Sequence, residues 1–180
     1  METTLNTNIK SSRAKAKGNL FENKVAKELG LWMFNDKDML SRHLTSGAQK
    51  SVWVGDIVPQ KQLPIYFNNG NFPFLIECKN GYKANIPNLN NQTIIRQWLT
   101  KARTEINQNQ KIIYLITSFH SYSPLLITDV PFSLITAGLV LNHIENSNSI
   151  PFFIYEYRKL LQYTFAELYD NNEYLVAKLK

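Results

Sequence analysis

The stretch from residue 74 to residue 80 constrains the fold most, because an apolar run leads directly into chemically active residues. Residues 74–76 are apolar and precede Glu77, Cys78 and Lys79. Such a run is typical of a buried strand that reaches the edge of its sheet. Side chains alternate along a strand, so Glu77 and Lys79 share one face and Cys78 occupies the other. A carboxylate and an ammonium at the end of an apolar strand must be paired, bound to a metal or functional.

A second carboxylate, Asp56, lies in the apolar segment 51–58, which the alternation of side chains predicts to be a strand. The Asn-Gly dipeptide at 69–70 is a strong signal for a hairpin turn between this region and the strand at 74–79. We therefore expect Asp56 and Glu77 to lie on neighbouring elements. Two carboxylates and a lysine in this arrangement can hold a divalent cation and a scissile phosphate, so the pattern indicates a nuclease.

The composition fits one globular domain, because 44% of the 180 residues are hydrophobic and 12% are aromatic. No apolar run approaches the roughly 20 residues of a membrane span, and no signal peptide is evident. A single cysteine excludes an internal disulfide and a multi-cysteine zinc site, so we expect the reducing cytoplasm. The net charge of +6 favours polyanionic partners, although an ordinary basic surface explains it at least as well.

The N-terminal segment predicts a flexible basic tail over residues 1–17, which either orders on nucleic acid or stays solvated. Its candidate DNA-binding residues are Lys10, Arg13, Lys15 and Lys17. Residues 19–29 follow with the periodicity of a helix that stops at Gly30. Glu22 then has two interpretations, since it either completes a capping box with Asn19 or serves as a third acid at the metal site.

Two loops carry further candidates for contacts with a substrate. The polar segment 41–50 predicts either a substrate-handling loop or an ordinary surface loop, and its candidates are Arg42, Ser46 and Lys50. His43 lies in the same segment without a visible partner, which is typical of a loop residue. Lys83 adds a candidate DNA contact in the asparagine-rich loop 81–90.

The rest of the chain predicts a helix and a strand that extend the sheet. Residues 92–107 have an amphipathic helical stripe, and the apolar strand at 111–117 follows it, so the pair forms a crossover on one face of the sheet. Further predicted elements are strands at 63–67, 123–128 and 152–157 and helices at 132–141 and 159–169. The many tyrosines of the C-terminal part favour a core or a subunit interface over stacked bases.

The candidate residues suit the chemistry of phosphodiester hydrolysis. This reaction needs an in-line nucleophile and neutralisation of charge on the phosphoryl oxygens. Mg²⁺ suits the task because it prefers oxygen ligands and keeps several waters. Asp56 and Glu77 would supply carboxylates, and the backbone carbonyl of Cys78 would add a ligand. Lys79 would orient or activate the attacking water and stabilise the developing charge. The alternative is a surface Glu–Lys pair beside an incidental aspartate.

This order of elements resembles the PD-(D/E)xK nuclease superfamily over about residues 15–120. The resemblance rests on a helix with Glu22, a strand with Gly55-Asp56, a strand with Glu77-Cys78-Lys79, and then a helix and an apolar strand. Within the superfamily, the segments Lys17-Gly18-Asn19-Leu20-Phe21-Glu22, Ser46-Gly47-Ala48 and Gly55-Asp56 are similar to the Holliday-junction resolvase branch.

The resemblance implies an α/β fold of the restriction-endonuclease type, with a central mixed β-sheet flanked by helices in the order αβββαβ. The nuclease core would span 18–130, and 131–180 would pack on it or form a dimer interface. The resemblance also implies Mg²⁺ or Mn²⁺ as cofactor, and its implied catalytic residues are Glu22, Asp56, Glu77, Lys79 and Gln97. Ser46 would sit in a loop that approaches DNA.

The implied activity is structure-specific cleavage of branched DNA by a homodimer, because resolving a junction needs two nicks related by a two-fold axis. One alternative is a restriction- or repair-type endonuclease that acts on linear duplex. The other is a nucleic-acid-binding module that keeps the fold without catalysis.

Overall fold

The computed structural model describes residues 2–43, 53–64, 70–82, 92–119, 123–145, 148–170 and 173. Its elements are α1 (Glu2–Phe34), β1 (Leu40–Arg42), β2 (Ile57–Pro59), β3 (Phe74–Tyr82), α2 (Gln92–Glu105), β4 (Ile112–Phe119), β5 (Leu125–Thr128), β6 (Leu139–Glu145), β7 (Asn148–Glu156), α3 (Tyr157–Leu160) and α4 (Phe165–Asp170). The first six elements follow the order αβββαβ, which confirms the predicted fold class.

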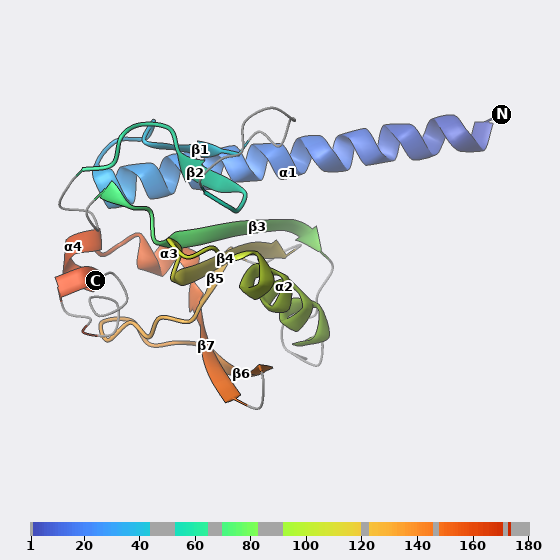
Figure 1. The fold of residues 1–180 in the computed structure, drawn as a ribbon. Coiled ribbons are helices and arrows are strands. Elements are labelled where there is room, and N and C mark those ends of the chain that lie inside the picture. Colours follow the sequence, from blue (N-terminus) through green and yellow to red (C-terminus); the bar gives the residue numbers. More distant parts are fainter. Residues whose placement is uncertain are drawn as a thin grey trace.

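The described strands form one seven-stranded mixed sheet in the order β1-β2-β3-β4-β5-β7-β6. The β3–β4 pair is parallel and the other neighbouring pairs are antiparallel. A parallel pair needs a crossover connection, and α2 lies within it, as the sequence predicts. The strands β6 and β7 extend the sheet beyond β5, so the C-terminal part of the chain belongs to the same sheet (Figure 1).

Helices cover both faces of the sheet because alternate residues of β3 enter two different apolar layers. Phe74 and Ile76 pack in one cluster with Leu29 of α1. Leu75 packs in the other cluster with Leu99 of α2. The central strands β3 and β4 are therefore buried on both sides, which is typical of parallel strands between helices.

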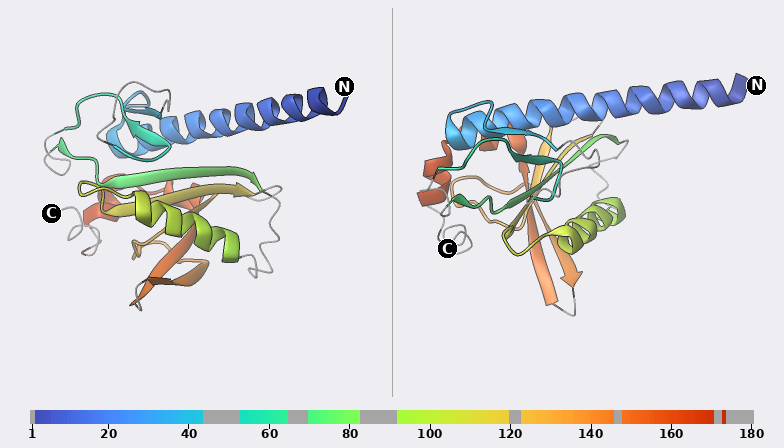
Figure 2. Two further views of the ribbon diagram at one scale, coloured as in Figure 1. Left: turned by 45° about the vertical axis from the view of Figure 1, so that its right-hand side comes forward. Right: turned by 45° about the horizontal axis from the view of Figure 1, so that its top comes forward.

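The N-terminal tail prediction is wrong about secondary structure, because α1 begins at Glu2 and includes residues 2–17. This segment contains neither glycine nor proline, so no helix breaker separates it from the helix predicted at 19–29. Asn19 consequently lies inside the helix, and the capping-box interpretation of Glu22 is excluded. The N-terminal half of α1 projects beyond the edge of the sheet (Figures 1 and 2).

The helix also continues past Gly30 and ends at Phe34. The left-handed residue after the helix is Asn35, with φ of 55°, and its amide donates to the carbonyl of Leu31 over 2.9 Å. Gly30 has a different function, because a Cβ atom there would lie 2.7 Å from the carbonyl oxygen of Asp36. The glycine thus lets the chain turn back against the helix it has just left.

Several predicted elements differ from the observed ones. Residues 51–52 of the strand predicted at 51–58 lie outside the described residues. Residues 53–56 are not in a strand, because Gly55 has a φ of 112° and interrupts the extended backbone, and β2 begins only at Ile57. The helix predicted at 132–141 is wrong, since residues 139–145 form β6 and pair with β7. The helix predicted at 159–169 is replaced by α3 and α4. The strand predicted at 63–67 and the turn at 69–70 extend outside the described residues.

The C-terminal segment packs against α1. The indole Nε1 of Trp32 donates a hydrogen bond to the carbonyl of Tyr163 over 2.7 Å. The Trp32 ring also meets the edge of Phe165, with ring centroids 5.1 Å apart. Leu160 and Leu168 are buried in the cluster that contains Leu29. Among the described residues, no helix combines the length and apolar character needed to cross a membrane.

Gln110 joins the loop before β2 to the central strand. Its buried side-chain amide donates to the carbonyls of Val54 (2.7 Å) and Phe74 (2.9 Å), and its Oε1 accepts from the amide of Val54 (3.3 Å). The buried glutamine side chain therefore makes the hydrogen bonds that a neighbouring strand would otherwise make to the backbone of Val54 and Phe74.

We expect Gln110→Ala to lower the free energy of unfolding by about 1–3 kcal/mol, because it leaves buried backbone groups without partners. Denaturant unfolding measures this loss. The exposed Gln108 provides a matched control, and Gln108→Ala should change stability by less than about 0.5 kcal/mol. Equal effects of the two substitutions would contradict this function of Gln110.

Candidate active site

Backbone contacts with β3 place Asp56 at the edge of the central strand. A Cβ atom on Gly55 would lie 2.8 Å from the carbonyl oxygen of Ile76, so only glycine permits this close approach. The next amide, that of Asp56, donates to the same carbonyl over 2.8 Å. The Asp56 carboxylate then accepts a hydrogen bond from the amide of Cys78 over 2.7 Å. These contacts fix one carboxylate oxygen beside the backbone between Glu77 and Lys79.

Lys79 brings the carboxylates of Glu77 and Asp56 together. Its Nζ lies 2.7 Å from Glu77 Oε2 and 3.9 Å from Asp56 Oδ2. Because the side chains alternate along β3, Glu77 and Lys79 share a face, as the sequence predicts. The side chain of Glu77 is 8% exposed and that of Asp56 is 31% exposed, so the group is accessible from the Asp56 side. The structure therefore places a cation between two carboxylates, on the part of β3 that lies beyond its pairing with β2.

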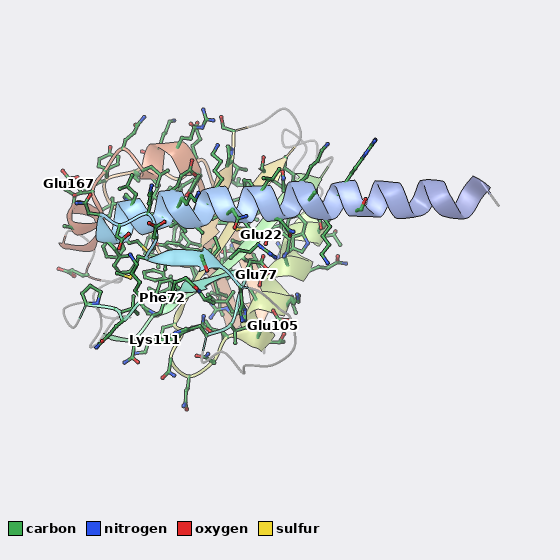
Figure 3. All side chains as sticks on the ribbon, turned by 90° about the horizontal axis from the view of Figure 1, so that it is seen from above. Glu22, Phe72, Glu77, Glu105, Lys111 and Glu167 are labelled. Atoms are coloured by element: carbon green, nitrogen blue, oxygen red, sulfur yellow. The ribbon has the colours of Figure 1, made fainter. Side chains whose placement is uncertain are left out.

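Glu22 joins this group from α1, and we call Glu22, Asp56, Glu77 and Lys79 the acid–lysine cluster. Figure 3 shows Glu22 and Glu77 in the view from above, with α1 lying over the strands. Burial raises the pKa of Glu22, and the negative charge of Asp56 raises it further. The guanidinium of Arg42 opposes this shift, since its Nε lies 3.9 Å from Glu22 Oε2. The predicted candidates Glu22 and Arg42 thus lie together at the cluster.

The electrostatics of β3 favour a charged lysine and a neutral thiol. Burial lowers the pKa of Lys79, but the charge and hydrogen bond of Glu77 and the charge of Asp56 raise it more, and the net shift is upward. Lys79 is therefore an ammonium at neutral pH. Burial raises the pKa of the Cys78 thiol well above its usual value. Cys78 can consequently offer its backbone carbonyl, but not a thiolate, to a cation.

His43 contributes a contact that the sequence did not reveal. Its backbone amide donates to the carbonyl of Asp56 over 2.7 Å, and its Nδ1 lies 3.2 Å from the carbonyl oxygen of Gly55. The histidine therefore supports the loop that presents Asp56. The sequence did not signal this role, because β1, which ends directly before His43, was itself not predicted.

The donor set fits an oxygen-preferring cation that retains water. Asp56 and Glu77 already converge on one positive charge, the ammonium of Lys79. Mg²⁺ in proteins is typically bound by one or two carboxylates together with waters and substrate phosphate. Within the described ranges, no group of three or more histidine, cysteine, aspartate or glutamate side chains is arranged to enclose a metal ion. The two carboxylates of Asp56 and Glu77 therefore fit an Mg²⁺ or Mn²⁺ ion that keeps several waters.

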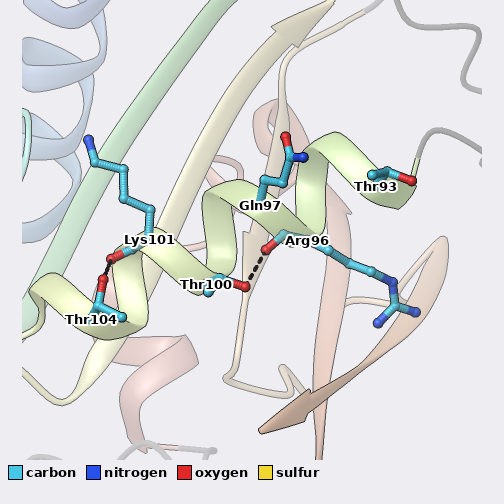
Figure 4. A pocket seen from close by; sticks show the side chains of 6 residues that line it. All are labelled: Thr93, Arg96, Gln97, Thr100, Lys101 and Thr104. Atoms are coloured by element: carbon cyan, nitrogen blue, oxygen red, sulfur yellow. Dashed lines mark hydrogen bonds between the residues drawn. The ribbon is translucent and has the colours of Figure 1, made fainter.

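The remaining predicted residues lie elsewhere or outside the described chain. Arg13, Lys15 and Lys17 are exposed on α1, and Lys10 lies on the same helix. Ser46, Lys50 and Lys83 lie outside the described residues. Gln97 is exposed on α2 and lines a shallow hollow with Arg96 and Lys101 (Figure 4). In the described part of the chain, no hydrogen bond or ion pair of the acid–lysine cluster includes Gln97.

Two substitutions should shift the pKa of Glu22 in opposite directions. We expect Asp56→Asn to lower it, because a neighbouring negative charge is removed, and Arg42→Gln to raise it, because the opposing positive charge is removed. Side-chain carboxyl NMR titration measures both shifts. Shifts of the same sign in the two variants would show that Glu22 does not face both groups.

A comparison with known protein families agrees with the nuclease interpretation of this site. A family model described as "Phage putative PDDEXK endonuclease" matches residues 13–173. No curated protein and no solved structure matches the chain. The matched segment contains the whole acid–lysine cluster and all strands of the described sheet. The match confirms the resemblance to the PD-(D/E)xK superfamily, and the chain belongs to this family of phage PDDEXK endonucleases.

Proposed function

We propose that the protein is a metal-dependent DNA endonuclease that hydrolyses phosphodiester bonds at the acid–lysine cluster. One observation carries the proposal: the ammonium of Lys79 lies between the carboxylates of Glu77 and Asp56, on the part of β3 beyond its pairing with β2. Buried carboxylates repel phosphate, so a module that only binds DNA would gain nothing from them. Family membership supports the same activity.

Each member of the cluster has a role that follows from its surroundings. Asp56 and Glu77, with the backbone carbonyl of Cys78, would hold Mg²⁺ or Mn²⁺. Such an ion, when bound, polarises phosphoryl oxygen and lowers the pKa of bound water. Lys79 is protonated at neutral pH, so it would stabilise negative charge on the phosphoryl group rather than remove a proton. Glu22, with its raised pKa, is suited to accept a proton released beside it.

The substrate within this class is proposed to be branched DNA, cleaved by a homodimer. The similarity of residues 17–22 to the resolvase branch supports this choice, and the net charge of +6 supports a polyanionic substrate. A two-fold dimer matches the symmetry of a four-way junction, which requires paired nicks. Linear duplex is the competing substrate for the same site.

We expect Asp56→Asn and Lys79→Ala to reduce cleavage by at least about 100-fold, because each removes charge that acts on the reacting phosphate. Cleavage is measured with four-way junction, flap, duplex and single-stranded DNA in Mg²⁺. Lys61→Ala is a matched control, since Lys61 forms an exposed ion pair with Asp36 away from the cluster.

Undiminished cleavage by the Asp56 or Lys79 variant would refute the assigned site. Paired, symmetric nicks in the junction would support the branched substrate. Symmetric cuts at a fixed sequence in linear duplex would instead show that linear duplex is the substrate. A wild-type protein that cleaves none of these substrates would refute the endonuclease proposal.

Metal binding can be measured without activity. We expect calorimetry to detect Mn²⁺ binding to the wild-type protein and a loss of at least about tenfold in affinity for Glu77→Gln, because one of the two carboxylate ligands is removed. Asp36→Asn, which changes an exposed carboxylate, should bind Mn²⁺ like the wild type. Equal affinities in all three proteins would place the metal elsewhere.

A further inference from the structure

Gly18 occupies the interior of α1, and among the described residues neither its conformation nor its packing requires glycine. It lacks the positive φ that three other glycines of the described chain adopt. Among the described residues, a Cβ atom at Gly18 would meet only Glu22 Oε1, at an ordinary contact distance of 3.8 Å. Glycine is a poor helix former compared with alanine. Within the part of the chain that the structure describes, alanine therefore fits at position 18, although glycine occupies it.

Gly30 and Gly55 provide the contrast. At each of these positions an added Cβ atom would lie within 3.0 Å of a backbone oxygen, at 2.7 Å and 2.8 Å respectively. Packing among the described residues thus explains both glycines, but it does not explain Gly18. A glycine that the fold does not require is typical of a place where another backbone approaches closely.

The position of Gly18 on the helix connects it to the acid–lysine cluster. Lys15, Gly18 and Glu22 are spaced i, i+3 and i+7, so they lie along one face of α1. One helical turn before Glu22, this face has no side chain because the residue there is Gly18. Two turns before Glu22, it carries the exposed Lys15. Asn80, at the end of β3, donates its side-chain amide to the carbonyl of Lys17 over 3.1 Å. This contact fixes the helix beside the strand that carries Glu77 and Lys79.

We propose that the α1 face formed by Lys15, Gly18 and Glu22 is the surface on which the DNA backbone lies next to the scissile phosphate. Gly18 would let the sugar-phosphate chain contact the helix, and Lys15 would pair with a phosphate one step beyond. This proposal rests on the proposed endonuclease function and names the part of the substrate that the site contacts. The N-terminal half of α1 projects beyond the sheet (Figure 2). By helix geometry residues 2–17 rise about 24 Å, which matches an arm of duplex of about seven base pairs.

Charge favours DNA over a second copy of the chain as the occupant of this surface. The exposed segment 12–17 carries three cations, Arg13, Lys15 and Lys17, and no acidic residue. Two such helices packed together would repel each other, whereas phosphates neutralise the same charges and release counterions. Arg13 and Lys17 point away from the face of Glu22, so Lys15 is the cation of this group that the helix directs toward the cleavage site.

The first test compares Gly18→Ala and Gly18→Leu with the wild type. Both replacements are good helix formers, so we expect the melting temperature to rise by roughly 2–4 °C. Binding to a 30-base-pair duplex, measured by fluorescence anisotropy in EDTA to prevent cleavage, should weaken about tenfold for alanine and more for leucine. Wild-type affinity in both variants would overturn the proposal, as would a fall in melting temperature, which would make Gly18 a structural residue.

The second test compares Lys15→Ala with Lys27→Ala on the same helix. Lys27 is also exposed but lies on the opposite face from Glu22, so it matches the charge without the position. We expect the Lys15 variant to lower the slope of log affinity against log salt by about one, and the Lys27 variant to leave the slope unchanged. Equal slopes for the two variants would overturn the assignment of Lys15.

The outcomes separate this proposal from the proposed function. Wild-type protein that binds duplex in a Gly18-dependent way but cleaves no DNA would refute the endonuclease activity and retain the binding surface. Wild-type protein that cleaves DNA, together with Gly18 variants that bind and cleave equally well, would refute the binding surface alone. Dimer dissociation caused by Gly18→Leu, with unchanged DNA affinity, would assign the surface to a second copy and overturn the proposal.

Discussion

The arrangement of the site depends on one contact, the hydrogen bond from the Cys78 amide to the carboxylate of Asp56. Strand β2 is short and shares only the pair Ile57–Ile76 with β3, so the backbone alone cannot hold the two segments in register further along. The Asp56 side chain continues the ladder in place of a backbone carbonyl. The carboxylate of Asp56 therefore accepts a backbone hydrogen bond from β3 and also lies beside Lys79. Asp56 thus serves both the fold and the site.

The part of the site that lies on one strand could be predicted from the sequence. The alternation of Glu77, Cys78 and Lys79 fixes which side chains share a face, because a strand has a period of two. The helix α2 and the parallel crossover to β4 were predictable for a similar reason, since each has a strong local periodicity. These predictions needed no information about distant residues, and they place the lysine and one carboxylate correctly relative to each other.

The contacts between distant segments could not be predicted in the same way. His43 and Gln110 support the Asp56 loop from 13 and 54 positions away in sequence, and neither residue type has a periodic signature. The extension of α1 to Glu2 could not be predicted because residues 2–17 are polar and have no apolar periodicity, and the segment signals a helix only by its lack of glycine and proline. Strand β6 was missed because its apolar residues become a strand only when β7 pairs with them.

Trp32 of α1 packs on Phe165 and donates a hydrogen bond to the carbonyl of Tyr163. These contacts join α1 to the segment at residues 163–165. Trp32 and its hydrogen-bond partner Tyr163 are 131 positions apart in the sequence. During synthesis, Trp32 therefore leaves the ribosome long before its partners do. The helix that carries Glu22 consequently completes its apolar surroundings only after residues 163–165 have left the ribosome. A nascent chain that stops short of these residues therefore lacks the fully packed surroundings of α1.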